Sequence, residues 1–122
     1  MNDLSLPWPP KDLSPNSRTH WAKRSKAAKA YRSACCLAAS QFVQNGGWPH
    51  LPTIGGDIHL WIDFYPPDRR HRDDDNMIAA FKAGRDGIAD ALGINDRRFR
   101  THPFVKGDVM GMVKVRITGG PD

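Results

Sequence analysis

The stretch Ile58-His-Leu-Trp-Ile-Asp-Phe-Tyr65 decides the fold that this sequence predicts. Apolar residues occupy every second position: Ile58, Leu60, Ile62 and Phe64. Successive side chains of an extended chain point to opposite sides, so this period of two predicts a β-strand with one buried face. Pro66-Pro67 ends the strand, because proline has no backbone N–H to donate to a neighbouring strand.

Two segments on either side of this strand have the pattern of helices. From about Trp21 to Val43, one stripe carries Tyr31, Cys35, Ala38 and Phe42. A second helix is predicted from Asp75 or Asn76 to Leu92. Asp75 is expected to be its N-cap, and Gly93 is a typical C-terminal stop.

The remaining regular segments are predicted strands. Leu4–Trp8 is short and stops at two prolines, and residues Lys11–His20 then form a polar loop. Phe99–Lys106 and Met110–Thr118 are expected to form a hairpin. The predicted order is β-α-β-α-β-β, which indicates one small α/β (α+β) domain over residues 1–122.

Composition limits the class of protein. The 122 residues contain 25% charged and 39% hydrophobic residues, which is typical of a folded chain. No apolar run approaches the roughly 20 residues of a transmembrane helix, and the N-terminus lacks the pattern of a signal peptide. The adjacent Cys35 and Cys36 are poor disulfide partners, so we expect reduced thiols in the cytoplasm. The net charge of +5 favours a polyanionic partner, most often nucleic acid.

The segment Asp68-Arg-Arg-His-Arg-Asp-Asp-Asp-Asn76 carries the most informative chemistry. Three consecutive carboxylates follow a run of cations: Asp73, Asp74 and Asp75 stand behind Arg69, Arg70, His71 and Arg72. Carboxylate oxygens are the ligands that Mg²⁺ and Mn²⁺ prefer. Arginine binds phosphate bidentately. A metal and a phosphate at one place indicate phosphodiester hydrolysis.

If the second helix is continuous, one of its faces carries Asp75, Lys82 and Asp86. Asp73 then lies just before the helix and Asp96 just after it. Each group also has a simpler interpretation. Asp75 can be a helix cap, Lys82 and Asp86 an ordinary i,i+4 ion pair, and Asp96 a turn residue.

The loop before the first helix alternates polar, cationic and aromatic groups up to Trp21. Such a pattern suits contacts to phosphates and stacking on unpaired bases. The alternative is a solvated loop in which Trp21 anchors the helix in the core. Together with the arginines before the carboxylates, the candidate DNA-binding residues are Asn16, Arg18, His20, Lys23, Arg24, Lys26, Arg69, Arg70 and Arg72.

Four stretches, in order along nearly the whole chain, resemble the RusA family of Holliday-junction endodeoxyribonucleases, which phages and prophages often encode. They are Leu6-Pro-Trp-Pro-Pro10, Leu13-Ser-Pro-Asn-Ser-Arg-Thr-His-Trp21, Tyr65-Pro-Pro-Asp-Arg-Arg-His-Arg-Asp-Asp-Asp-Asn76, and Phe81-Lys-Ala-Gly-Arg-Asp-Gly87 continued by Asn95-Asp96. Two positions depart from the pattern. Ala79 stands where some members carry a lysine, and Asn95 replaces the first acid of an acidic pair.

The resemblance implies a mixed β-sheet, a homodimer and a bacterial cytoplasmic enzyme that acts on branched DNA with Mg²⁺, for which Mn²⁺ would substitute. It implies that Asp73, Asp75 and Asp96 bind the metal, that Lys82 is the lysine of the catalytic site, and that Asp86 is an auxiliary acid. Two alternatives to junction resolution stay open. One is a nucleic-acid-binding module without catalysis, and the other is a nuclease for flaps or replication forks.

Overall fold

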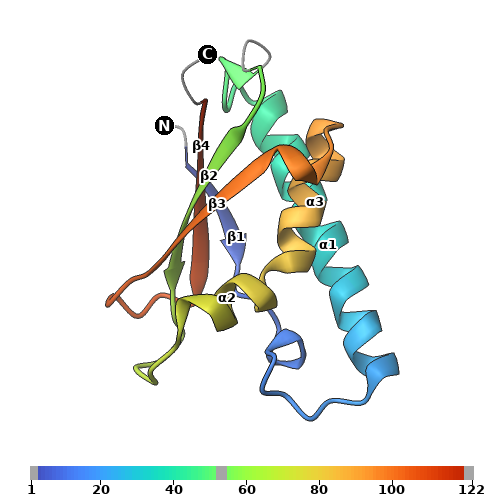
Figure 1. The fold of residues 1–122 in the computed structure, drawn as a ribbon, viewed down its shortest axis with the longest axis vertical. Coiled ribbons are helices and arrows are strands. Elements are labelled where there is room, and N and C mark those ends of the chain that lie inside the picture. Colours follow the sequence, from blue (N-terminus) through green and yellow to red (C-terminus); the bar gives the residue numbers. More distant parts are fainter. Residues whose placement is uncertain (1–2, 52–54, 120–122) are drawn as a thin grey trace.

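A computed structural model describes residues 3–51 and 55–119 as a four-stranded sheet with helices on one side (Figure 1). The strands are β1 (Leu4–Pro7), β2 (Ile58–Tyr65), β3 (Phe99–Val105) and β4 (Met112–Gly119). The helices are α1 (Trp21–Gln44), α2 (Asp74–Ala80) and α3 (Lys82–Leu92), with short 3-10 turns η1 (Lys11–Leu13) and η3 (Asp96–Arg98). Both the strand at 58–65 and the first helix lie where the sequence predicts them.

The strand order across the sheet is β1-β4-β2-β3. β4 runs antiparallel to both β1 and β2, whereas β2 and β3 are parallel. A parallel pair needs a long crossover, and α2 and α3 supply it. The small α+β fold with a mixed sheet is therefore confirmed. The predicted hairpin of the last two strands is wrong, because β2 lies between β3 and β4 and pairs with both.

The core lies between the sheet and the helix pair α1 and α3, which run side by side in Figure 1. All four predicted apolar residues of β2 are at most 1% exposed. Gly84 and Gly87 let the two helices approach closely. A Cβ added at Gly87 would lie 2.3 Å from the carbonyl oxygen of Arg32 on α1.

The second predicted helix is the main correction. It breaks at Phe81 into α2 and α3, and Figure 1 shows α2 crossing the lower end of the fold while α3 runs beside α1. The Phe81 side chain is 1% exposed and packs edge-on against Phe64 and Tyr31. The chain changes direction where this side chain enters the core. The helical pattern of the sequence does not predict such a change. The predicted N-cap was also wrong, since Asp73 occupies that position and Asp75 lies in the first turn.

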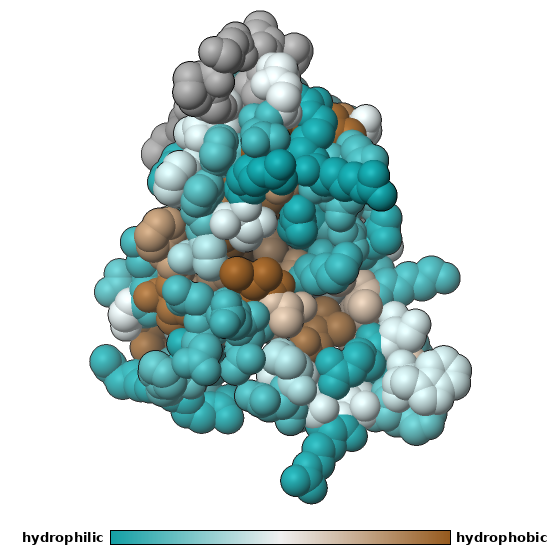
Figure 2. Space-filling view, in the orientation of Figure 1, coloured by the Kyte–Doolittle hydropathy of each residue, from teal (hydrophilic) through white to brown (hydrophobic). Residues whose placement is uncertain are grey.

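The surface on the side shown in Figure 2 is mostly hydrophilic, and hydrophilic side chains gather at its lower end, near the connection from β2 to α2. Within residues 3–51 and 55–119, no helix is long and apolar enough to cross a membrane.

Candidate active site

The three consecutive aspartates lie on the surface at the start of α2. Asp73 is the N-cap residue, although its side chain forms no capping hydrogen bond. One of its carboxylate oxygens lies 3.1 Å from Nε2 of His71. Asp74 and Asp75 occupy the first turn, where negative charge is favoured by the helix dipole. These carboxylates therefore face solvent beside a cationic segment.

The structure brings a different set of acids together around Lys82. The Lys82 ammonium lies 3.3 Å from the Asp86 carboxylate, one turn along α3. Asp96, the first residue of η3, lines the same cavity of about 400 Å³. The full lining is Arg32, Lys82, Asp86, Ala89, Asp90, Ile94, Asn95 and Asp96. Asp73 and Asp75 do not line it, because the break at Phe81 separates the first turn of α2 from α3.

The fit to a divalent cation is therefore incomplete. Carboxylate oxygens are suitable ligands for Mg²⁺. In the described part of the chain, however, no group of three or more His, Cys, Asp or Glu side chains lies close enough to hold one ion. The ligand set Asp73, Asp75 and Asp96 is not assembled in this conformation.

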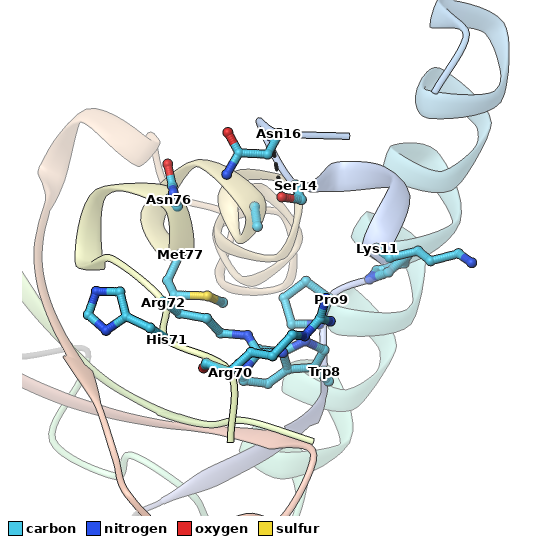
Figure 3. Close-up of a pocket in the computed structure, with 12 residues that line it drawn as sticks. Trp8, Pro9, Lys11, Ser14, Asn16, Arg70, His71, Arg72, Asn76 and Met77 are labelled. Atoms are coloured by element: carbon cyan, nitrogen blue, oxygen red, sulfur yellow. Dashed lines mark hydrogen bonds between the residues drawn. The ribbon is translucent and has the colours of Figure 1, made fainter. Parts of the chain in front are cut away.

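A second cavity, of about 260 Å³, joins the N-terminal loop to the segment before α2. It is lined by Trp8, Pro9, Pro10, Lys11, Ser14, Asn16, Arg70, His71, Arg72, Asn76, Met77 and Ala80. Figure 3 shows Arg70 and Arg72 extending toward Trp8 and Pro9, while His71 and Lys11 point outward on opposite sides. Stretches about 60 residues apart thus form one concavity that is lined by both apolar and cationic side chains.

Arg72 is the residue that holds the cationic segment in shape. Only 14% of its side chain is exposed, and it forms a salt bridge of 2.9 Å with Asp68. It also donates to the Arg70 carbonyl oxygen at 3.0 Å and lies 5.4 Å above the Trp8 ring. The Arg72 guanidinium, helped by the Arg70 backbone N–H, holds the pKa of Asp68 well below its usual range. Arg70 also pairs with Asp68 at 3.4 Å, but its side chain is 81% exposed.

Arg24 has a comparable structural role in the N-terminal loop. Its guanidinium donates to the carbonyl oxygens of Ser14 and Ser17 at 3.2 and 2.9 Å. Thr19 donates to Asp12 at 2.9 Å. These bonds fix the loop against the first turn of α1. Arg24 was predicted as a DNA contact. In the structure, its guanidinium instead binds carbonyl oxygens of the protein's own loop.

The start of α1 resolves the two interpretations of Trp21. His20 is the N-cap, and its Nδ1 accepts a hydrogen bond from the Ala22 backbone N–H at 3.2 Å. The Trp21 side chain is 74% exposed, and its ring lies 5.5 Å from that of His20. The interpretation of Trp21 as a core anchor is therefore wrong. The predicted cations around it, Arg18, Lys23 and Lys26, are also exposed.

Sequence reasoning missed Arg32, which lines the Lys82 cavity, and Arg85, which contacts the backbone of Asp96. Arg32 of α1 forms a bidentate pair with Asp90 at 2.7 and 2.9 Å. Arg85 donates to the Asp96 carbonyl oxygen at 2.8 Å and so holds η3 against α3. Both arginines lie in predicted helices, where charged residues usually form the solvent-exposed face. The signal available for Arg85 was its position one turn after Lys82, on the helix that precedes Asp96.

Comparison with known proteins gives a relative but no activity. No family model matches the chain. An uncharacterized protein of Xylella fastidiosa (strain Temecula1 / ATCC 700964) is 52% identical over an alignment of 122 positions, which covers 98% of this chain and 77% of the relative. At this identity and coverage, the chain belongs to the same family as that uncharacterized protein.

Proposed function

We propose that this protein is a Mg²⁺-dependent endonuclease of the RusA type, which resolves four-way DNA junctions by paired symmetric nicks in recombination and repair. The observation that carries the proposal is the cationic cavity between the N-terminal loop and the segment before α2. It unites three of the four stretches on which the resemblance to that family rests. The proposal includes a homodimer in the bacterial cytoplasm, because two symmetric nicks require two sites.

The cavity has the chemistry of a phosphate-backbone site. Arg70 and Lys11 provide exposed cations at its rim, and Asn16 and Asn76 provide amide groups. Arginine and amide side chains commonly bind phosphate oxygens and thereby position a protein on DNA. Arg72 contributes indirectly, since its bonds to Asp68 and to the Arg70 carbonyl oxygen keep the segment folded.

Cleavage is assigned to the carboxylates and Lys82, none of which lines this cavity. When bound, Mg²⁺ supplies polarisation of the phosphate and activation of a water molecule. Asp73, Asp75 and Asp96 are assigned to it on the resemblance. The Lys82 ammonium is 69% exposed and borders Asp86, so it would offset negative charge on the phosphate oxygens. Arg85 would keep Asp96 in place through its backbone carbonyl.

A nucleic-acid-binding module without catalysis is the competing function. The observation that favours it is that the described carboxylates do not converge on one point. In that case Asp73 and its neighbours would only stabilise the start of α2.

Cleavage of a labelled four-way junction, compared with linear duplex and with flap and fork substrates, separates these functions. Reactions contain Mg²⁺, Mn²⁺ or chelator, and binding is measured separately by electrophoretic shift. We expect paired nicks on the junction that disappear in chelator. Asp75→Asn and Asp96→Asn should lower cleavage by about 100-fold or more, the size of effect typical for a lost electrostatic contribution to catalysis, and should keep junction binding.

Asp74→Asn is the matched control, because it removes an adjacent carboxylate that has no assigned function. It should cut as the wild type does. Arg70→Gln should weaken junction binding and reduce its salt dependence. Junction binding without cleavage in either metal would overturn the enzyme in favour of the binding module. Faster cutting of flaps or forks than of junctions would overturn the assigned substrate.

A further inference from the structure

The face of the sheet opposite α1 and α3 carries a row of rings. His59 and Trp61 come from β2, and His102 and Phe104 come from β3. Each pair is spaced by two residues, so its members share one face. Figure 1 shows all the helices on the other side of the sheet. Phe104 is 44% exposed, and the other three rings are half-buried.

Adjacent rings of this row are nearly parallel. The interplanar angle is 21° between His59 and His102, 17° between His102 and Trp61, and 12° between Trp61 and Phe104. The corresponding centroid distances are 5.0, 4.2 and 6.3 Å. Hydrogen bonds fix the rings. Nδ1 of His59 lies 2.7 Å from Nε2 of His102, and Nε1 of Trp61 donates to the Thr118 hydroxyl at 2.7 Å.

The row lies among cations. Lys106 sits 5.5 Å from the centre of the Phe104 ring and 3.7 Å from Asp63. Arg116 on β4 is the register partner of Trp61, and Lys114 is that of Asp63. Within the described residues, no carboxylate lies within salt-bridge distance of Lys114 or Arg116. Lys114 itself lies 5.5 Å from the centre of the Tyr65 ring. The face therefore combines partly exposed π-surface with more cations than carboxylates, since Asp63 is matched by Lys106.

Lys106 also connects this face to the cationic segment. It lines a cavity of about 470 Å³ together with Asp68, Arg69, Arg70, His71 and Arg72. This cavity, which Asp74 also lines, therefore joins the cationic segment to the edge of the sheet face.

We propose that this open face binds unpaired nucleotides of a DNA strand, with bases stacked at the Phe104 and Trp61 end of the row and phosphates near Lys106, Lys114 and Arg116. Stacking on aromatic side chains inside a cationic groove is the usual way in which proteins hold single strands without reading their sequence. Contact with a second copy is disfavoured, because two faces of the same positive charge would be brought together. The inference rests on the proposed function only in taking DNA as the ligand.

Binding of a labelled single strand of roughly ten nucleotides, within the range of site sizes for such grooves, tests the inference. Fluorescence anisotropy is measured with the full chain in chelator, and a blunt duplex serves as the competing ligand. Phe104→Ala should weaken single-strand binding about tenfold, as expected for the loss of one stacked base. Phe104→Tyr keeps a ring and should bind as the wild type does, whereas Phe104→Leu should resemble alanine. Duplex binding should not change.

Leu37→Ala is the control, since Leu37 is an exposed apolar residue of α1 with 61% exposure. It should leave binding unchanged. Equal single-strand binding by the wild type and Phe104→Ala would overturn the inference. So would a Phe104→Ala variant that binds normally but loses self-association in sedimentation, which would make the face a contact between copies. The binding assay contains chelator and no metal, so it can succeed even if the protein does not cleave junctions. Failure of this inference and failure of the proposed function are therefore distinguishable.

Discussion

The two faces of the sheet are built from the same strands but differ in what their side chains do. On the covered face, Ile58, Leu60, Ile62 and Phe64 are at most 1% exposed beneath α1 and α3. On the open face, His59 and Trp61 alternate with them and join His102 and Phe104 in a row of nearly parallel rings. The covered face supplies stability through burial, whereas the open face keeps aromatic and cationic groups accessible. A sheet covered on one side can therefore divide folding and binding between its two surfaces.

The largest effect should come from removing one phenylalanine from each face. Phe64 is fully buried and packs edge-on against Trp8 and Phe81. Phe64→Ala should lower the free energy of unfolding by about 3–5 kcal/mol. Phe104→Ala should change it by only about 0.5 kcal/mol, as is usual for surface positions. Chemical denaturation measures both. Similar losses at the two positions would contradict the division between the faces.

A smaller effect is expected where α1 and α3 approach over the covered face. Gly87→Ala would place a methyl group 2.3 Å from the Arg32 carbonyl oxygen and 3.1 Å from Cβ of Cys35. Overpacking of this kind costs about 1–3 kcal/mol, which exceeds the gain in helix propensity of about 1 kcal/mol. The melting temperature should fall.

Gly107→Ala is the matched control for this helix contact. An added Cβ there would meet no atom within 4 Å. This substitution should leave the melting temperature nearly unchanged. A Gly87→Ala variant as stable as the wild type would mean that the helix pair is packed more loosely than the structure shows.

The smallest effect concerns the solvent-exposed rim of the helix pair. The Arg32 guanidinium lowers the pKa of the Asp90 carboxyl. A carboxyl with a lowered pKa stabilises the fold above its unfolded pKa of about 3.9, and this contribution is lost as the pH falls through the folded pKa. Because both side chains are about half exposed, Asp90→Asn should cost only about 0.5 kcal/mol at neutral pH.

Melting temperatures of the wild type and Asp90→Asn between about pH 2 and 7 test this sign, since the Asp titration lies in that range. The difference between the two proteins should shrink toward the acid end and in high salt. Asp108→Asn, in the exposed connection between β3 and β4, provides a control without a salt bridge among the described residues. A difference that grows on acidification would contradict the assignment.

Local patterns in the sequence predict the elements better than they predict the site. The alternation in 58–65 and the stripe in α1 depend on which residues avoid water, and periodicity reports that directly. The continuous second helix failed because Phe81 turns toward Phe64 and Tyr31, which are 17 and 50 residues away in the chain. The cavity of Arg70 and Asn16 was likewise unpredictable in detail, since it depends on how two distant loops meet.

Neighbouring residues in the sequence are enough to predict the covered strand, the long first helix, the cationic character and the acidic segment at the start of a helix. The folded arrangement of the chain is needed to see which acids share a cavity with Lys82, that Trp21 lies in solvent, and that four rings align on the open face. These outcomes depend on contacts between segments far apart in the chain, whose geometry is set by core packing and strand register rather than by any local pattern.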